Sequence, residues 1–187
     1  MIAGELKGRP LLAPRGWSVR PTSDRVREAT FSALGEIEGA RVADLFCGTG
    51  ALGIEAISRG AEHATFVDRD TRAVFGNVEA LGLRERSELI RADVTRWLKR
   101  LHGEGEHVLA GEAAYDLVFC DPPYRLADAL GPQLDTRLPG LLAEGGRLIF
   151  ESPASRPMRI GSLKRLRQRR YGGTDISIYA KAGTERR

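Results

Sequence analysis

Cysteine and histidine are scarce in this sequence of 187 residues. Only two cysteines occur, Cys47 and Cys120, each inside an apolar run, and the three histidines, His63, His102 and His107, show no metal-ligand spacing. Two buried, reduced thiols are therefore expected. Neither a disulfide framework nor a metal site is predicted.

Long apolar runs are also missing. No segment approaches the ~20 consecutive apolar residues of a membrane-spanning helix. The opening residues, MIAGELKGRP, contain no apolar signal-peptide core. Repeats and low-complexity tracts do not occur either. The sequence therefore predicts a soluble cytoplasmic monomer with one ordinary domain, and it disfavours membrane, exported and repeat-array classes.

Acidic residues are absent from one strongly basic stretch. Residues 155–171 contain Lys and Arg but no Asp or Glu, and residues 1–27 contain only Glu5 and Asp24 as acids, although the net charge of the whole chain is only +4. Basic ends on a near-neutral body suggest that both ends hold one polyanion. A solvated positive surface is the alternative, and charge alone leaves the two open.

Strands and helices alternate after an arginine-rich arm, residues 1–22; residues 23–187 are expected to form the domain. A helix is expected over 22–37. Strands then follow at 41–46, 63–68, 87–93, 115–124 (with a terminating turn) and 147–152, helices at 51–60, 70–83, 94–102 and 126–143, and a closing hairpin at 163–182. This order predicts an α/β fold, with a mostly parallel sheet, helices on both faces and an antiparallel edge. Ligands of such sheets bind beyond the carboxyl ends of the strands.

The first strand ends in a glycine loop, DLFCGTGALG. Gly48, Gly50 and Gly53 form a G-x-G-x-x-G variant, which lets the backbone turn tightly but is shared with NAD-binding proteins. A dinucleotide requires an unobstructed helix N-terminus for its pyrophosphate, whereas Asp44, ahead of the loop, favours a cationic ligand such as S-adenosylmethionine. A simple capping role is the alternative for Asp44.

The next two strands also end in acids. Asp68 follows the glycine loop by about 20 residues, the spacing at which a carboxylate accepts both hydroxyls of a ribose. A turn or helix cap is the alternative, and Asp70 is the better candidate for that cap. Asp93 is placed to reach an adenine amino group, with Val94 beside it, although a helix N-cap explains Asp93 nearly as well.

The fourth strand stops at CDPPYR, because two prolines cannot continue a central strand. An exocyclic base amine is a poor nucleophile, since its lone pair is delocalised into the ring. The Asp121 carboxylate and the Pro122 carbonyl, held by Pro122 and Pro123, would accept its two hydrogens and favour the positive charge that develops on nitrogen. Tyr124 would stack on the base. The alternative is a strand terminator with a packed tyrosine.

DLFCGTGALG followed by DPPY resembles the class I S-adenosylmethionine-dependent amino-methyltransferases, which have a seven-stranded sheet ending in a hairpin. AGELKGRPL, RPTSDRVREATFSAL and LGIEAISRGA look more specifically like the RsmD family. Its members methylate N2 of a guanine in small-subunit (16S) ribosomal RNA. The resemblance covers residues 2–181 and implies catalysis at Asp121, Pro122, Pro123 and Tyr124. The implied S-adenosylmethionine contacts are Asp44, Phe46, Gly48, Gly50, Asp68, Arg69, Asp93 and Val94.

Basic residues are expected to grip ribosomal RNA, or the small ribosomal subunit, around an extruded guanine. The predicted RNA contacts are Lys7, Arg9, Arg15, Arg20, Thr22, Arg25, Arg27, Arg167 and Arg169. Arg25 could instead pair with Glu28 on one helix. Other readings stay open: N6-adenine methylation of RNA or DNA, methylation of a side-chain amide, and a non-catalytic RNA-binding or ribosome-assembly protein. A nicotinamide-dependent oxidoreductase is disfavoured by Asp44 and DPPY.

Overall fold

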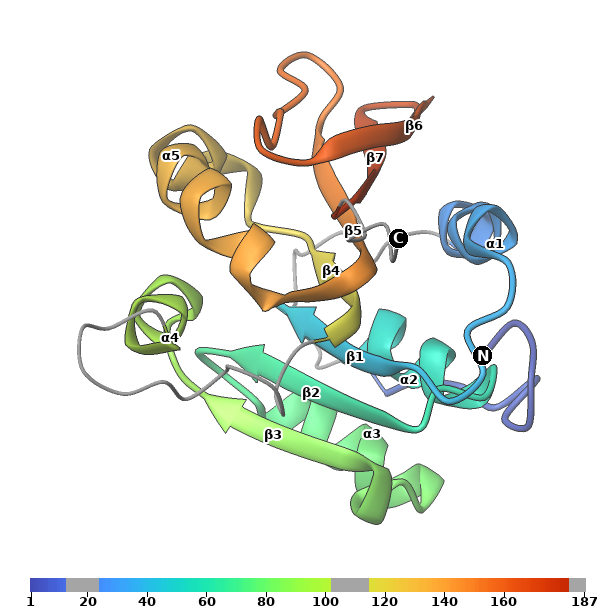
Figure 1. The fold of residues 1–187 in the computed structure, drawn as a ribbon. Helices are drawn as coiled ribbons and strands as arrows, with labels where there is room; N and C mark the ends of the chain where they lie inside the picture. Colours follow the sequence, from blue (N-terminus) through green and yellow to red (C-terminus); the bar gives the residue numbers. More distant parts are fainter. Residues whose placement is uncertain (13–23, 102–114, 182–187) are drawn as a thin grey trace, which may run out of the picture.

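A seven-stranded sheet in the order β3-β2-β1-β4-β5-β7-β6 forms the centre of the protein (Figure 1). The computed structural model describes residues 1–12, 24–101 and 115–181, and of residues 124–129 the backbone alone. The strands are β1 (Arg41–Leu45), β2 (His63–Asp68), β3 (Ser87–Arg91), β4 (Tyr115–Cys120), β5 (Leu142–Pro153), β6 (Lys164–Tyr171) and β7 (Thr174–Ala180). The helices are α1 (Asp24–Leu34), α2 (Ala51–Ser58), α3 (Arg72–Leu81), the 3-10 turn η1 (Arg84–Arg86), α4 (Val94–Leu101) and α5 (Tyr124–Leu141).

The sheet is mostly parallel, as the sequence predicts. β1 to β5 run parallel to one another, and β7 pairs antiparallel with both β5 and β6. Strand order reverses between β1 and β4, because the chain builds outward through β2 and β3 on one side and through β5 on the other. This switch point is where ligands of open α/β sheets bind.

Two apolar cores lie on opposite faces of the sheet. The face covered by α1, α2 and α3, named here the α1 face, contains Phe31, Ile54 and Val78 packed on the sheet. The face covered by α4 and α5, named the α5 face, contains Trp97 and Leu138. Because both faces are covered, the inner strands are continuous apolar runs, and successive residues of a strand enter opposite cores.

Element boundaries differ from the sequence prediction by a few residues. The largest difference is β5, which already begins at Leu142 and contains Gly145 and Gly146, residues that connect the predicted helix 126–143 to the predicted strand 147–152. A register shift between Tyr115 and Leu117 accompanies this longer strand, and Gly145 has a φ of 73°. The bulge depends on pairing with β4, a distant segment of the chain, and so cannot be predicted from the local sequence.

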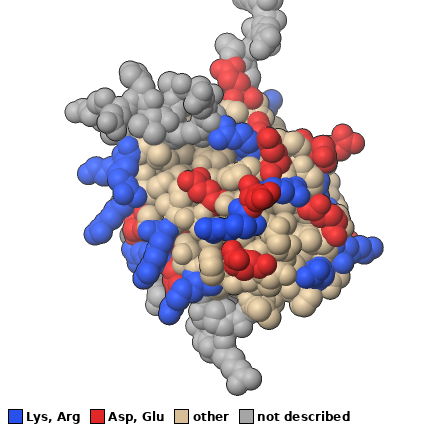
Figure 2. All heavy atoms as spheres, turned by 90° about the horizontal axis from the view of Figure 1, so that it is seen from below, with Lys and Arg blue, Asp and Glu red and all other residues tan. Residues whose placement is uncertain are grey.

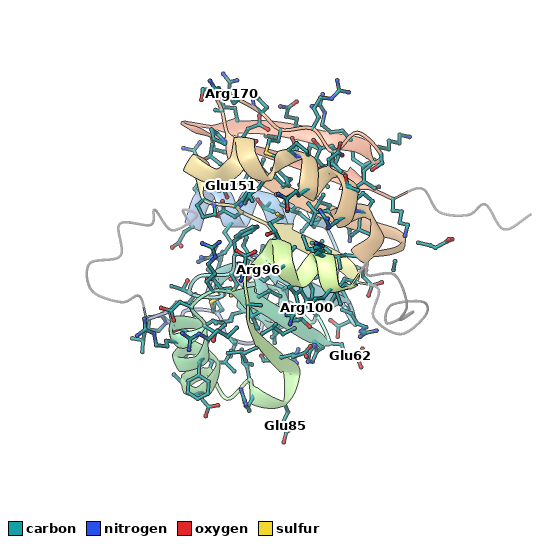
Figure 3. All side chains as sticks on the ribbon, turned by 90° about the vertical axis from the view of Figure 1, so that its left-hand side faces the viewer. Glu62, Glu85, Arg96, Arg100, Glu151 and Arg170 are labelled. Atoms are coloured by element: carbon teal, nitrogen blue, oxygen red, sulfur yellow. The ribbon has the colours of Figure 1, made fainter. Side chains whose placement is uncertain are left out.

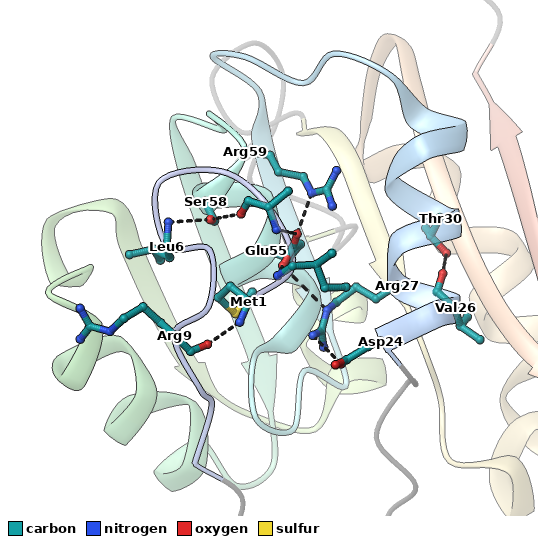
Figure 4. A network of polar contacts seen from close by, with 12 residues as sticks. Met1, Leu6, Arg9, Asp24, Val26, Arg27, Thr30, Glu55, Ser58 and Arg59 are labelled. Atoms are coloured by element: carbon teal, nitrogen blue, oxygen red, sulfur yellow. Dashed lines mark hydrogen bonds and ion pairs between the residues drawn. The ribbon is translucent and has the colours of Figure 1, made fainter.

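Residues 1–12 pack against α2 and α3. The backbone N–H groups of Ile2 and Ala3 donate to the Glu55 carboxylate at 2.8 and 3.0 Å (Figure 4). Gly4 has a φ of 78°, and a Cβ there would lie 1.5 Å from the Ser58 carbonyl oxygen, so the close approach requires glycine. This part of the predicted arm is thus docked on the domain; residues 13–22 lie outside the described residues.

Both cysteines, Cys47 and Cys120, are buried free thiols, as expected. Within the described residues, no helix combines the length and apolar character of a membrane span. The same residues contain no group of acidic, histidine or cysteine side chains arranged to hold a metal ion.

Candidate active site

The loop from β1 to α2 requires its glycines for conformation and for packing. Phe46, Gly48 and Gly50 have φ values of 59°, 53° and 78°. A Cβ on Gly50 would lie 2.5 Å from Val74, and one on Gly53 would lie 2.4 Å from the Phe66 ring. The loop therefore lies tightly against its neighbours with its backbone held at the carboxyl end of β1.

Asp44 lies beneath this loop, on the α1 face of β1. Its side chain is buried, and Oδ2 accepts the Gly53 N–H at 2.9 Å, so Asp44 does cap the turn into α2. The pKa of Asp44 is raised to about 7, mainly by burial; the Gly53 hydrogen bond lowers it in part, and the nearby charge of Asp68 adds to the rise. The described residues place no cation beside this buried carboxylate, and such an acid at a strand end is suited to a positively charged ligand.

Asp68, at the end of β2, joins the loop to the second strand. Oδ2 accepts the Gly48 N–H at 3.0 Å, and Oδ1 accepts the Asp70 N–H at 3.1 Å. Asp70 in turn accepts the Arg72 N–H at 3.1 Å at the start of α3, although the residue directly before that helix is Thr71. Asp68 therefore holds the glycine loop against the end of β2, and Asp70 accepts the hydrogen bond at the start of α3.

Asp93, beyond β3, is an N-cap in this structure. Its Oδ1 accepts the Arg96 N–H at 3.0 Å and the Thr95 hydroxyl at 2.6 Å, and its Oδ2 accepts from Arg69 Nε at 2.8 Å and from Arg69 Nη2. The Thr95 bond, followed by the Arg69 bonds, lowers the pKa of Asp93 to about 2. Arg69, Arg91, Ala92, Asp93 and Arg96 line one open cavity here, and Arg96 lies on α4 (Figure 3). The neighbouring Val94 is buried.

The DPPY segment begins where β4 ends, beside the glycine loop. The Asp121 N–H reaches the Leu45 carbonyl oxygen at 3.5 Å. Asp121 is half-buried, Pro122 is buried and Pro123 is exposed. Burial raises the pKa of Asp121, and the charges of Glu151 and then Asp44 raise it further. Tyr124 begins α5; its side chain lies outside the described residues.

Glu151 is an acid of this site that the sequence prediction missed. Cys120 pairs with Phe150 in register, so the next residues lie side by side: Asp121 directly after β4 and Glu151 within β5. Glu151 is only 8% exposed. The available signal was an acid that directly follows the apolar residues of a central strand.

Asn77, on α3, was also missed. Its side chain is 1% exposed. Nδ2 donates to the carbonyl oxygens of Thr49 at 3.0 Å and Leu12 at 3.1 Å, and Oδ1 accepts the Leu12 N–H at 2.7 Å. One amide thus connects the glycine loop to the N-terminal segment. A lone polar residue between Val74 and Val78 on the buried side of the helix was the available signal.

The predicted RNA contacts differ in how far their side chains are exposed. Lys7, Arg9 and Arg25 are exposed, and Arg9 Nη2 donates to the Ala80 carbonyl oxygen at 3.3 Å. Arg167 and Arg169 are exposed on the edge strand β6, in register with Ile178 and Ile176 of the α1 face. The remaining predicted contacts lie outside the described residues: Arg15, Arg20 and Thr22.

Arg27 requires a correction. It is 6% exposed, and its guanidinium pairs with Asp24 at 2.9 Å and lies 3.9 Å from the Glu55 carboxylate. Arg27 therefore joins α1 to α2 inside the protein and is not available to RNA. The predicted pair of Arg25 and Glu28 is not among the ion pairs of the described residues either; the pair within α1 is Asp24 with Arg27.

The charges are not evenly mixed over the surface. On the face seen from below, where α3 and β3 lie, basic and acidic side chains are interspersed (Figure 2). Ion pairs at this end include Arg86 with Glu5 at 2.6 Å and Arg84 with Glu79 at 3.8 Å. Arg170, on β6, lies at the opposite end of the molecule from Glu85 (Figure 3), so the acid-free basic strand is far from this mixed face.

Residues 1–180 match the family model described as "Conserved hypothetical protein 95". The chain is 38% identical to YlbH of Bacillus subtilis, provisionally named an rRNA methyltransferase, over 98% of this chain and 99% of that protein. The chain belongs to this RsmD-like methyltransferase family. It is also 37% identical to ribosomal RNA small subunit methyltransferase D of Escherichia coli, a match that covers 67% of this chain but only 60% of that protein.

A solved structure of yhhF from Escherichia coli, provisionally described as a methyltransferase, shares the fold. It superimposes with a TM-score of 0.76 at 27% identity, over 98% of both chains. The predicted class I methyltransferase fold is therefore confirmed. S-adenosylmethionine, the cofactor predicted from the glycine loop and Asp44, is the cofactor of this class of methyltransferase.

The residues at the loop fit S-adenosylmethionine on their own chemistry. The ligand carries a sulfonium and an ammonium but no phosphate, and Asp44 offers a buried carboxylate that pairs with no cation among the described residues. The glycine backbone leaves no Cβ between the loop and a ligand. The negative charge of a pyrophosphate would be repelled by this carboxylate.

Proposed function

We propose that the protein transfers a methyl group from S-adenosylmethionine to the exocyclic N2 of a guanine in small-subunit ribosomal RNA. The observation that carries this proposal is the juxtaposition of two strand ends at the switch point. Leu45 and Cys120 are paired residues of β1 and β4, so the glycine loop with Asp44 and the segment beginning at Asp121 leave the sheet side by side.

The cofactor, when bound, supplies an electrophilic methyl group on sulfur. The amine of the base must present its lone pair to that methyl. The Asp121 carboxylate and the Pro122 carbonyl would accept the two amine hydrogens and stabilise the positive charge that develops on nitrogen. A new N–C bond would form as the C–S bond breaks, and one N–H proton would then leave to water. No strong general base is needed, because the methylated nitrogen is acidic.

The proposed cofactor contacts are those predicted from the sequence. Asp44 faces the positive charge of the ligand from beneath the loop, while Phe46, Gly48 and Gly50 shape the backbone against it. Asp68 and Asp93 keep the predicted ribose and adenine roles, which we propose alongside the ordering and capping contacts already described. Arg69 and Val94 flank Asp93.

The proposed RNA surface combines the exposed cations of the N-terminal segment, α1 and β6. These residues are Lys7, Arg9, Arg25, Arg167 and Arg169, together with the predicted contacts Arg15, Arg20 and Thr22. Arginine is well suited to phosphate, since its planar guanidinium forms paired hydrogen bonds. The names of YlbH and of ribosomal RNA small subunit methyltransferase D support ribosomal RNA, or the small ribosomal subunit, as the partner of a cytoplasmic monomer.

The test is incubation with methyl-labelled cofactor and ribosomal RNA or small subunits from a strain lacking the enzyme, followed by nucleoside analysis. N2-methylguanosine is the expected product. N6-methyladenosine would replace the guanine proposal with adenine methylation. Tight RNA binding without labelled nucleoside would instead identify a non-catalytic binding protein. Asp121→Ala, measured in parallel, controls for contaminating methyltransferases.

A further inference from the structure

Glu151 stands next to the proposed catalytic acid on the neighbouring strand. Phe119 pairs with Ile149 in register, and both enter the core of the α1 face. Because side chains alternate along a strand, Asp121 and Glu151, two residues further on, are directed to that same face. The β5 segment continues past Glu151 to Pro153 and pairs there with β7, which fixes the backbone of Glu151.

Two carboxyl groups are neighbours here, those of the buried Glu151 and the half-buried Asp121. Burial disfavours the charged form of Asp121, and a neighbouring negative charge disfavours it further. Glu151 contributes in this way to the raised pKa of Asp121. An amide or an apolar residue would fill the same place without that repulsion. Acids kept in such positions are candidates for function, and here the second acid lies beside the first rather than elsewhere in the sheet.

The Watson–Crick edge of the base determines what a second acceptor can recognise. Guanine presents its N1–H directly beside the N2 amine, so two adjacent acceptors match its two neighbouring donors. Adenine presents an N1 lone pair beside its N6 amine, and a carboxylate would repel that lone pair. Enzymes that flip a base read this edge by hydrogen bonds within the pocket.

We propose that Glu151 is a specificity-determining residue, which accepts the N1–H of the target guanine while Asp121 accepts a hydrogen of its N2 amine. This inference rests on the proposed function, since it requires a guanine in the site. It assigns the choice between guanine and adenine to the β5 strand end, whereas the DPPY segment serves amino groups of either base.

The first experiment uses the unaltered protein and two RNA substrates that differ only at the target base. One contains guanine, and the other contains 2-aminopurine, which keeps the 2-amino group but lacks the 6-oxo group and has a lone pair in place of N1–H. The expected kcat/KM for 2-aminopurine is lower by at least about 100-fold, because a site built to bind a donor rejects an analogue that lacks it. Equal kcat/KM values would overturn the proposal without any variant.

The second experiment uses Glu151→Gln. A glutamine amide can accept N1–H through its oxygen or donate to the N1 lone pair through its nitrogen. The ratio of kcat/KM for guanine to that for 2-aminopurine is therefore expected to fall to about 10-fold or less, against about 100-fold or more for the unaltered protein. A ratio that stays at the original value would refute the role of Glu151.

Asp175→Asn is the matched control. Asp175 is a carboxylate 2% exposed on β7, paired in register with Ser152 and therefore directed to the opposite face from Glu151. It accepts hydrogen bonds from Gln168 at 2.9 Å and Ser177 at 3.1 Å. This variant should keep the guanine preference. Failure of the proposed function is separately visible, because the unaltered protein would then form no N2-methylguanosine on the guanine substrate.

Discussion

Asn77 Nδ2 donates a hydrogen bond to the carbonyl oxygen of Thr49 at 3.0 Å and so fixes the glycine loop to α3. The same amide binds both backbone groups of Leu12. We therefore expect Asn77→Ala to weaken S-adenosylmethionine binding, because Thr49 loses its anchor. Unfolding free energy should fall by about 2–4 kcal/mol, since several buried polar groups lose partners. Calorimetric titration and thermal unfolding measure the two effects.

Gly76→Ala provides the control for that variant on the same helix. Nothing lies within 4 Å of a Cβ built at Gly76. Alanine should stabilise α3 by about 0.5–1 kcal/mol and leave cofactor affinity unchanged. Unaltered cofactor affinity in Asn77→Ala would show that the Thr49 contact does not support the site.

Asp44 should make stability depend on pH. Its pKa is about 7 in the folded protein and about 3.9 in an unfolded chain. The folded state then holds more protons between these values, so the contribution of Asp44 is fully present below about pH 4 and is lost as pH rises to about 7. Asp44→Asn should remove this loss, which amounts to about 4 kcal/mol at most. Denaturant unfolding of both proteins from pH 4 to pH 8 measures the difference.

The same substitution should impair cofactor binding. A cation bound beside Asp44 favours the ionised carboxylate, so binding near pH 7 should release protons. Calorimetric titration in buffers of different ionisation enthalpy reports this release. Asp44→Asn should bind the cofactor more weakly and release fewer protons. Equal proton release by both proteins would place the ligand's charge away from Asp44.

Asp121→Ala should lower kcat by about 10²–10³-fold, the range for loss of one group that stabilises transition-state charge. Cofactor affinity should change little, because Asp44 and the loop remain. In the unaltered enzyme the raised pKa of Asp121 predicts that activity falls as pH is lowered and this carboxylate is protonated. Glu151→Gln removes the neighbouring charge, so the acidic limb of its pH–rate profile should move to lower pH. An unshifted limb would show that another group controls it.

Arg167 and Arg169 can be tested together against a cation on the other face. The double substitution to Gln should reduce the slope of log binding constant against log salt by about 1.4–1.8, according to whether single-stranded or duplex RNA is bound. Arg165→Gln is the control, because Arg165 is also exposed but in register with Tyr179 of the α5 face. A larger effect of Arg165→Gln would move the RNA to that face.

Substitutions of Arg25 and of Arg27 should have different effects, the first on RNA binding and the second on stability. Arg27→Ala removes a buried cation that pairs with Asp24 and lies near Glu55, and we expect a loss of about 2–4 kcal/mol of unfolding free energy. Arg25→Ala should leave stability unchanged and weaken RNA binding. Denaturant unfolding and RNA titration at several salt concentrations distinguish the two. Equal stability of both variants would contradict the structural role of Arg27.

Apolar runs and their strand ends were predictable from the sequence, because a covered parallel strand such as β2 must be apolar throughout. The acids Asp44, Asp68 and Asp121 were found by the same reasoning, since they follow or interrupt such runs. The positions of Arg25 and Arg27 show where this reasoning fails. Both are arginines of one helix, but Arg27 lies on its buried side, where it approaches the distant residue Glu55.

Contacts between segments that are distant in the chain explain the other omissions. Glu151 reads as an ordinary acid at the end of a strand until β5 is placed beside β4. Asn77 reads as one polar residue of a helix until Leu12 and Thr49 meet it. Both depend on contacts between segments far apart in the chain, which neither periodicity nor a local motif encodes.

The order of the last strands has a consequence for how the chain is made. β6 is bonded to the sheet only through β7, which is synthesised after it. Until residues 174–180 have been synthesised, the outer edge of β5 and the arginine-rich segment 164–171 both lack β7, the strand with which they pair. Closure of the sheet therefore waits for the final strand, and nascent chains stalled before residue 174 should be sensitive to protease and prone to aggregate.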